Sequence, residues 1–184
     1  MASPGHGGAV GSWPRPGAAR LARSVAAERG LGRQFHRHTV TRRYLAVVPG
    51  YVGPQRILTH LVRDRGDGRR GSGPDPRLGK QAITHVEVVE RLVGYTLLAC
   101  RLETGRTHQI RIHLAELGHS VCGERVYNRG PGEKPRIDAS VAPRLALHAA
   151  ELGFVHPVSR QTMHWVMELP PDLQAFLAAL RRSQ

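Results

Sequence analysis

The stretch AITHVEVVERLVGYTLLACRLETGRTHQIRIHLAELG, residues 82–118, changes from a strand-like to a helical pattern within a few residues. Residues 82–90 and 95–103 are rich in β-branched and apolar side chains and flank a short turn containing Gly94, so they predict a hairpin or two adjacent strands. Gly105 then permits a tight turn into the next segment. A sheet followed directly by a short helix is typical of the α+β class.

A short helix is predicted at THQIRIHLAELG, residues 107–118. Thr107 is the expected N-cap and Gly118 the expected stop signal. Apolar residues at i, i+4 and i+7 form one stripe along this helix: Ile110, Leu114 and Leu117. The helix therefore has one face for the core and another for solvent or a ligand.

Further strands are predicted on both sides of this stretch, at residues 40–48, 56–62 and 162–169. Alternation along the first of them places Arg42, Tyr44 and Ala46 on one face and the residues between them on the other. Residues 144–157 mix helical and strand signals. A helix is expected at residues 170–182. The predicted fold is α+β, a mixed but largely antiparallel sheet with short flanking helices.

The composition of the chain narrows its function. A length of 184 residues suits one domain, and the formal net charge of +13 attracts polyanions, nucleic acid before anionic membrane. Of the 27 basic residues only Lys80 and Lys134 are lysines; the arginines offer planar donors to phosphates, although codon bias explains such an excess equally well. Two cysteines exclude a disulfide-rich scaffold. The longest apolar runs are too short for a membrane helix.

Residues 1–30 form an Arg-, Gly- and Pro-rich segment that we expect to be poorly structured, with a weak helical pattern toward its end. This segment is rich in arginine and has no acidic residue before Glu28, a pattern that is also compatible with a mitochondrial transit peptide. Residues 31–184 form the predicted catalytic domain.

Basic and polar residues gather where the helix at 107–118 begins. Arg106, His108 and Arg111 lie where free backbone N–H groups favour an anion, which indicates a phosphate or carboxylate site. A solvated basic helix face explains the same pattern. A zinc site is not expected, because His108 and His113 are five residues apart and point about 140° away from each other around a helix.

Residues 102–127 resemble the third motif of the RluA family of RNA pseudouridine synthases, close to L-x-T-G-R-x-H-Q-I-R-x-H-L-x-x-x-G-H-P-I-x-G-D-x-x-Y. Ser120 stands where proline is usual and Glu124 where aspartate is usual. Three further segments resemble motifs of this family in the same order: VTRRYLAVVPG at 40–50, RLALHAAELGFVHPVS at 144–159 and MELPPDL at 167–173. On these motifs the chain is identified as a member of the family.

The resemblance implies an isomerase that converts uridine to pseudouridine in rRNA or tRNA without a cofactor. It implies a tyrosine that removes the C5 proton, at Tyr44, and an arginine that pairs with a catalytic aspartate, at Arg111. Arg106, His108 and Gln109 are then expected on the RNA-binding rim. The expected partner is RNA, with no membrane and no obligate protein partner, in the cytoplasm.

The catalytic aspartate of the family lies in an H-R-L-D-x-x-T-S-G motif ahead of the tyrosine, and this chain has no such motif. Its first aspartate is Asp64, which follows Tyr44. HRHT at residues 36–39 contains no carboxylate. We therefore expect a truncated catalytic domain that is inactive alone. The alternatives are a non-catalytic RNA-binding relative that keeps the basic groove and a basic structural protein of the ribosome.

Overall fold

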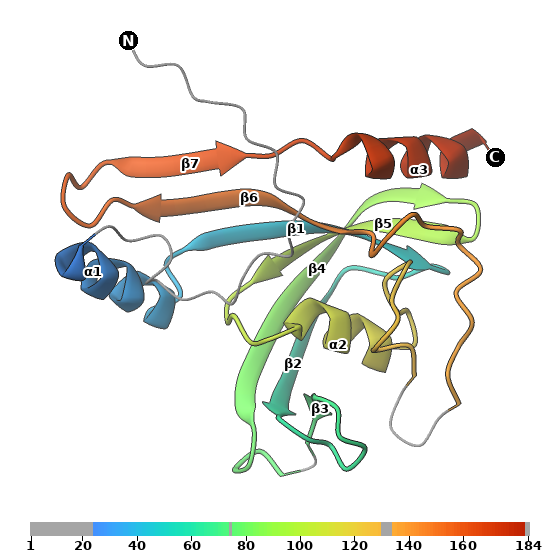
Figure 1. Ribbon diagram of the computed structural model, residues 1–184, viewed down its shortest axis with the longest axis horizontal. Coiled ribbons are helices and arrows are strands. Elements are labelled where there is room, and N and C mark those ends of the chain that lie inside the picture. Colours follow the sequence, from blue (N-terminus) through green and yellow to red (C-terminus); the bar gives the residue numbers. More distant parts are fainter. Residues whose placement is uncertain (1–23, 74, 130–133, 183–184) are drawn as a thin grey trace.

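A seven-stranded sheet in the order β3-β2-β4-β5-β1-β6-β7 dominates the computed structural model, which describes residues 24–73, 75–129 and 134–182 (Figure 1). Each neighbouring pair is antiparallel. The strands are β1 (Thr41–Pro49), β2 (Gln55–Val62), β3 (Gly71–Ser72), β4 (Lys80–Leu92), β5 (Tyr95–Leu102), β6 (Leu147–Val155) and β7 (Thr162–Val166). The helices are α1 (Val25–His36), α2 (Gln109–Glu116) and α3 (Pro171–Arg182). The predicted α+β class is confirmed.

The hairpin predicted at residues 82–103 is the β4–β5 pair, whose turn contains Gly94 at a φ of 73°. The sheet is antiparallel throughout the described residues, rather than mixed as predicted. The ambiguous residues 144–157 contain strand β6. Its pairing with β1 shifts register between Arg43 and Tyr44, which is a β-bulge.

Helix α2 begins later than the sequence predicted. Its N-cap is His108, in the left-handed conformation at a φ of 58°, and no side chain caps the helix, so the assignment of Thr107 as N-cap was wrong. Ile110 and Leu114 are buried as expected, whereas Leu117 is 37% exposed because the helix has ended before it.

Helix α1 begins within the Arg-rich segment at the start of the chain. Ser24 caps it by accepting a hydrogen bond from the backbone N–H of Ala27 at 3.2 Å. Gly30 lies inside the helix and so close to Pro157 that a side chain would collide with the proline ring. The helix therefore crosses the predicted boundary at residue 30, while residues 1–23 lie outside the described part of the chain.

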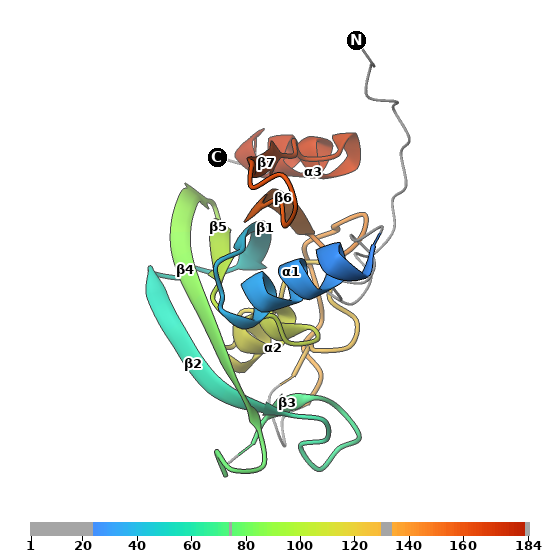
Figure 2. The same ribbon diagram turned by 90° about the vertical axis from the view of Figure 1, so that its left-hand side faces the viewer.

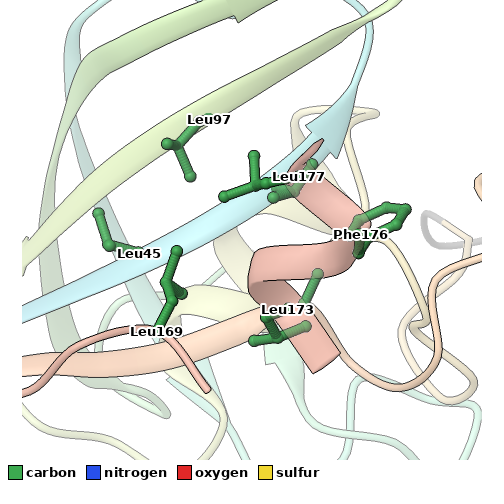
Figure 3. Close-up of a pocket in the computed structure, with 8 residues that line it drawn as sticks. Leu45, Leu97, Leu169, Leu173, Phe176 and Leu177 are labelled. Atoms are coloured by element: carbon green, nitrogen blue, oxygen red, sulfur yellow. The ribbon is translucent and has the colours of Figure 1, made fainter. Parts of the chain in front are cut away.

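The two faces of β1 have different coverings. Leu45 and Val47 face α3 and line a small apolar cavity with Leu173, Phe176 and Leu177 (Figure 3). Tyr44 alternates with Leu45 and therefore lies on the opposite face, which α1 and α2 cover (Figure 2). The cavity measures about 10 Å³ and has apolar walls, so it has neither the size nor the polarity of a ligand site.

Among the described residues, none of the helices has the length and apolar character needed to cross a membrane.

Candidate active site

Tyr44 lies at the middle of β1 on the face that α2 covers. It pairs across the sheet with Cys100 of β5 and Ala149 of β6, and Cys100 in turn pairs with Val86 of β4. Thr84 lies two residues before Val86 on the same face of β4. Its hydroxyl forms a hydrogen bond of 2.9 Å with His113 of α2. This chain of neighbours places the Tyr44 phenol and helix α2 on one side of the sheet, as the predicted site requires.

Arg111 is held by a carboxylate of the chain itself. Its Nε and Nη2 atoms each donate to a carboxylate oxygen of Glu124 at 2.6 Å, and Glu124 is only 4% exposed. The guanidinium also lies 5.0 Å above the ring centre of Tyr127. The resemblance implies that Arg111 pairs with the catalytic aspartate. Glu124 already occupies one edge of its guanidinium.

His108 completes this group at the start of α2. Its Nδ1 atom lies 2.8 Å from the hydroxyl of Tyr127, and the two rings meet edge to face. The prediction that His108 and Arg111 share one face of the helix is confirmed, since both contact Tyr127. His108 is exposed, which suits the predicted RNA-binding rim.

Gln109 does not fit the rim. It is only 2% exposed, and both ends of its amide are used within the protein. Its Oε1 accepts from the hydroxyl of Thr104 and the backbone N–H of Arg106, and its Nε2 donates to the carbonyl of Ile83 and the hydroxyl of Thr84. Gln109 therefore fixes the turn between β5 and α2, which corrects the prediction that it contacts RNA.

Arg106 and Arg42 meet at this turn. Arg106 is partly exposed and donates from Nε to the carbonyl of Gln81 at 3.0 Å. Arg42, on the Tyr44 face of β1, donates from Nη2 to the carbonyl of Glu103 at 2.9 Å and lies over the ring of Phe35 in α1. Alternation along the strand predicted that Arg42 lies on the face of Tyr44. It predicted no role for Arg42, because a two-residue period does not show how deeply a side chain is buried.

A basic loop borders the site on its other side. Within residues 63–70, Arg69 donates to the carbonyl of Val126 at 2.8 Å and Arg65 to that of Arg129 at 3.3 Å. These bonds hold the loop against residues 124–129. Arg70 is close enough to His108 to lower its pKa. The loop thus adds positive charge beside the site, which residue spacing did not predict.

Burial and charge set the titration of the site. Burial raises the pKa of Tyr44, and the neighbouring charge of Arg42 opposes that rise. Burial and then the charge of Arg111 lower the pKa of His108, which favours its neutral form. Burial pushes the pKa of Glu124 upward, but the hydrogen bonds from Arg111 and from the backbone N–H groups of Val126 and Tyr127 outweigh it, so Glu124 stays ionised.

The described residues contain no group of three or more histidine, cysteine or acidic side chains that could hold a metal ion. The site offers guanidinium groups, a phenol and an imidazole instead. Such groups bind anions and transfer protons.

Comparisons with known proteins agree with this arrangement. Residues 17–116, more than half of the chain, match the sequence profile of the family described as RNA pseudouridylate synthase. The chain belongs to this family. The resemblance to the RluA family found in the motifs is thereby confirmed.

Individual relatives point the same way. The chain is 38% identical over 162 residues to a protein of Zymomonas mobilis named ribosomal large subunit pseudouridine synthase D, covering 87% of this chain and 51% of the relative. A protein of the same name from Nitrosomonas europaea is 41% identical over 162 residues, which is 88% of this chain and 47% of that protein. The chain thus spans about half the length of these relatives.

A solved structure titled human RNA pseudouridylate synthase domain containing 1 superposes with a TM-score of 0.66 at 26% identity, covering 84% of this chain and 65% of the other. The human domain containing 4 superposes with a TM-score of 0.68 at 18% identity, which supports the fold alone. The sheet and helices are therefore those of a pseudouridine synthase domain.

Proposed function

We propose that this chain provides the tyrosine and arginine part of an RNA pseudouridine synthase site, with Tyr44 and Arg111 as catalytic residues and Arg106 and His108 on the RNA-binding rim. The observation that supports the proposal most directly is the placement of Tyr44 on the same face of the sheet as α2. The names of the Zymomonas and Nitrosomonas relatives favour large-subunit rRNA over tRNA as the substrate. A cytoplasmic location and the absence of an obligate protein partner belong to this proposal.

The reaction is an isomerisation. The uridine is flipped out of its stack, which costs a few kcal/mol that contacts to the backbone must offset. The bond between N1 and C1′ breaks, the uracil turns, and a bond between C5 and C1′ forms. The proton on C5 leaves and N1 gains one, so no atom is lost overall. In this scheme Tyr44 accepts the C5 proton, and the adjacent positive charge of Arg42 stabilises the phenolate that must form.

The nucleophilic carboxylate is the missing part. The sequence has no aspartate before Asp64, and Asp64 accepts hydrogen bonds from the backbone N–H groups of Gly66 and Gly68 in its own loop. Without a nucleophile the barrier to breaking the glycosidic bond is not lowered. The 184-residue chain is therefore expected to bind RNA and to be inactive alone. If the chain stays inactive even when a nucleophilic carboxylate is supplied, it is a non-catalytic RNA-binding relative.

Release of tritium from rRNA labelled at uridine C5 tests the proposal. The purified chain is expected to bind this RNA in a salt-sensitive manner and to release no tritium. A fusion that adds the N-terminal part of the Zymomonas relative is expected to release it. In the fusion, Tyr44→Phe is expected to slow release by roughly 10²–10⁴-fold, the range of a lost acid–base group.

Tyr51→Phe is the matched control, because Tyr51 is 60% exposed beyond the end of β1 and should tolerate the change. Release by the unfused chain would refute the claim that it is inactive. RNA binding without release by a folded fusion would favour the non-catalytic relative.

A further inference from the structure

Several arginines of the described residues share one pattern. Each presents its Nε and Nη2 edge to both oxygens of a carboxylate: Arg65 to Asp67, Arg111 to Glu124, Arg144 to Asp172 and Arg181 to Glu90. This fork-to-fork geometry is the strongest hydrogen-bonded arrangement that a guanidinium forms.

Arg42 departs from this pattern although it is buried. It is 6% exposed, and within the described residues its Nε atom is fully covered yet has no hydrogen-bond partner. Its Nη2 reaches only backbone carbonyls, of Glu103 at 2.9 Å and Leu102 at 3.5 Å. Leaving a buried, positively charged donor without a partner is unfavourable, because the group loses its hydration and gains no hydrogen bond in return.

The surroundings fix the Arg42 guanidinium in place. The ring of Phe35 in α1 lies 5.6 Å from its Cζ atom, and the carbonyl of Glu103 anchors the other side. At Gly105 a Cβ atom would collide with Nη1, so this glycine leaves the room in which the guanidinium lies. The side chain is therefore held, and the unused Nε edge is a fixed feature of the site.

The charges around Arg42 favour an anion. Among the described residues no aspartate or glutamate forms an ion pair with Arg42. The titratable groups that act on it are the Tyr44 phenol, which is uncharged at neutral pH, and the guanidinium of Arg106. Two guanidinium groups near each other in a partly desolvated site strengthen the attraction for a negative group.

We infer that the Nε edge of Arg42 is a receptor for a carboxylate, and that in the pseudouridine synthase it positions the nucleophilic aspartate beside Tyr44. This inference rests on the proposed function, from which the need for an aspartate comes. Arg42 then acts as a second guanidinium for that carboxylate, complementing Arg111, whose own Nε edge is filled by Glu124.

A side-chain carboxylate suits this place better than an RNA phosphate. Arg42 is two residues from Tyr44 on the same face of β1 and almost completely covered. A phosphodiester has a ribose on each side and is too bulky to approach a covered atom. A side-chain carboxylate is smaller than a phosphodiester, and its planar shape matches the guanidinium edge.

Acetate is the probe for this site, with the 184-residue chain as the protein. At constant ionic strength, acetate is expected to shift the Arg42 Nε–H resonance saturably in NMR spectra and to raise the melting temperature. The Nε–H of Arg144, which already binds Asp172, is expected not to move. Arg42→Gln is expected to weaken acetate binding roughly tenfold or more, the loss of one charged hydrogen bond.

Arg43→Gln is the matched control, because Arg43 is the next residue of β1 and faces the other way; it should bind acetate like the unchanged protein. Arg42→Lys keeps the charge without the fork and is expected to bind with intermediate affinity. If Arg42→Gln does not fold, the Nε–H shift in the unchanged protein decides alone.

An unmoved Arg42 resonance overturns the inference. So does a shift caused by inorganic phosphate or a short RNA but not by acetate, which would identify a backbone-phosphate site. Because acetate binding needs no turnover, the inference and the proposed function fail separately. Acetate binding with an inactive fusion would refute only the function, and an active fusion with an unresponsive Arg42 would refute only the inference.

Discussion

The two faces of strand β1 are built from alternate residues of one short segment, yet they differ in almost every physical property. Toward α3, Leu45 and Val47 pack against Leu173, Phe176 and Leu177 with almost no free volume. Toward α1 and α2, Arg42 and Tyr44 lie near the guanidinium of Arg106, backbone carbonyls and the ring of Phe35. One face is stabilised by apolar burial, and the other contains buried charge.

Apolar burial stabilises one face of β1, and hydrogen bonds to charged groups stabilise the other. Apolar packing does not depend on the protonation of side chains, so the stability that the α3 face supplies should change little with pH. The α2 face holds charged groups that must stay hydrogen-bonded to be tolerated. Substitutions on the first face should therefore change stability alone, and those on the second should change stability, pH dependence and RNA binding together.

The largest effect on stability is expected from Phe176→Ala on the α3 face. Phe176 is buried in the apolar layer, and its truncation should lower the free energy of unfolding by about 3–5 kcal/mol. RNA affinity at a temperature where the variant is folded should stay unchanged. Urea unfolding followed by fluorescence, and filter binding with rRNA, measure the two. A large loss of RNA affinity in the folded variant would contradict the claim that the α3 face affects stability alone.

Glu124→Gln should show the behaviour of the α2 face. The change leaves the partly buried Arg111 without its counter-charge, at a cost of about 3 kcal/mol in unfolding free energy. Asp172→Asn is the matched control, since it breaks the similar but exposed pair with Arg144 and should change the free energy of unfolding little. Equal costs in urea titrations of the two variants would contradict the assignment of Glu124 as a buried counter-ion.

The smallest of the three effects is the pH dependence due to His113. This residue lies between the hydroxyls of Thr59 and Thr84, and burial lowers its pKa to about 4. Because the folded pKa lies below the unfolded one near 6.5, the unfolded chain binds more protons between these values, and stability falls as pH falls. The expected loss between pH 7 and pH 4.5 is about 2 kcal/mol.

Urea unfolding at several pH values measures this loss. His113→Gln should flatten the pH dependence in that window, whereas His36→Gln at the exposed end of α1 should leave it intact. An unchanged slope in His113→Gln would assign the acid sensitivity to other groups.

Much of the fold followed from local patterns. The strands β1, β2, β4, β5 and β7, together with α2 and α3, were predicted from two-residue and helical periodicities. The N-cap of α2 was wrong because a left-handed His108 is a tertiary requirement that spacing does not reveal. Residues 144–157 were ambiguous because most side chains of β6 are partly buried on both faces, so buried and exposed residues do not alternate along it.

The candidate site was predicted only in part. The family motifs predicted Tyr44, His108 and Arg111 as site residues, but they did not predict how deeply each side chain is buried. The resemblance placed Gln109 on the RNA-binding rim, whereas its amide is buried by hydrogen bonds to β4. The pairing of Arg111 with Glu124 joins residues on a helix and a later loop, which no periodicity connects.

The amide of Gln109 connects the end of β5, strand β4 and the beginning of α2 without bearing a charge. Concentrated salt screens exposed cations and should release bound RNA, but it has little influence on a neutral hydrogen bond away from solvent. A preparation washed free of nucleic acid at high ionic strength should consequently retain the shape of its binding surface and rebind RNA as soon as the salt is removed.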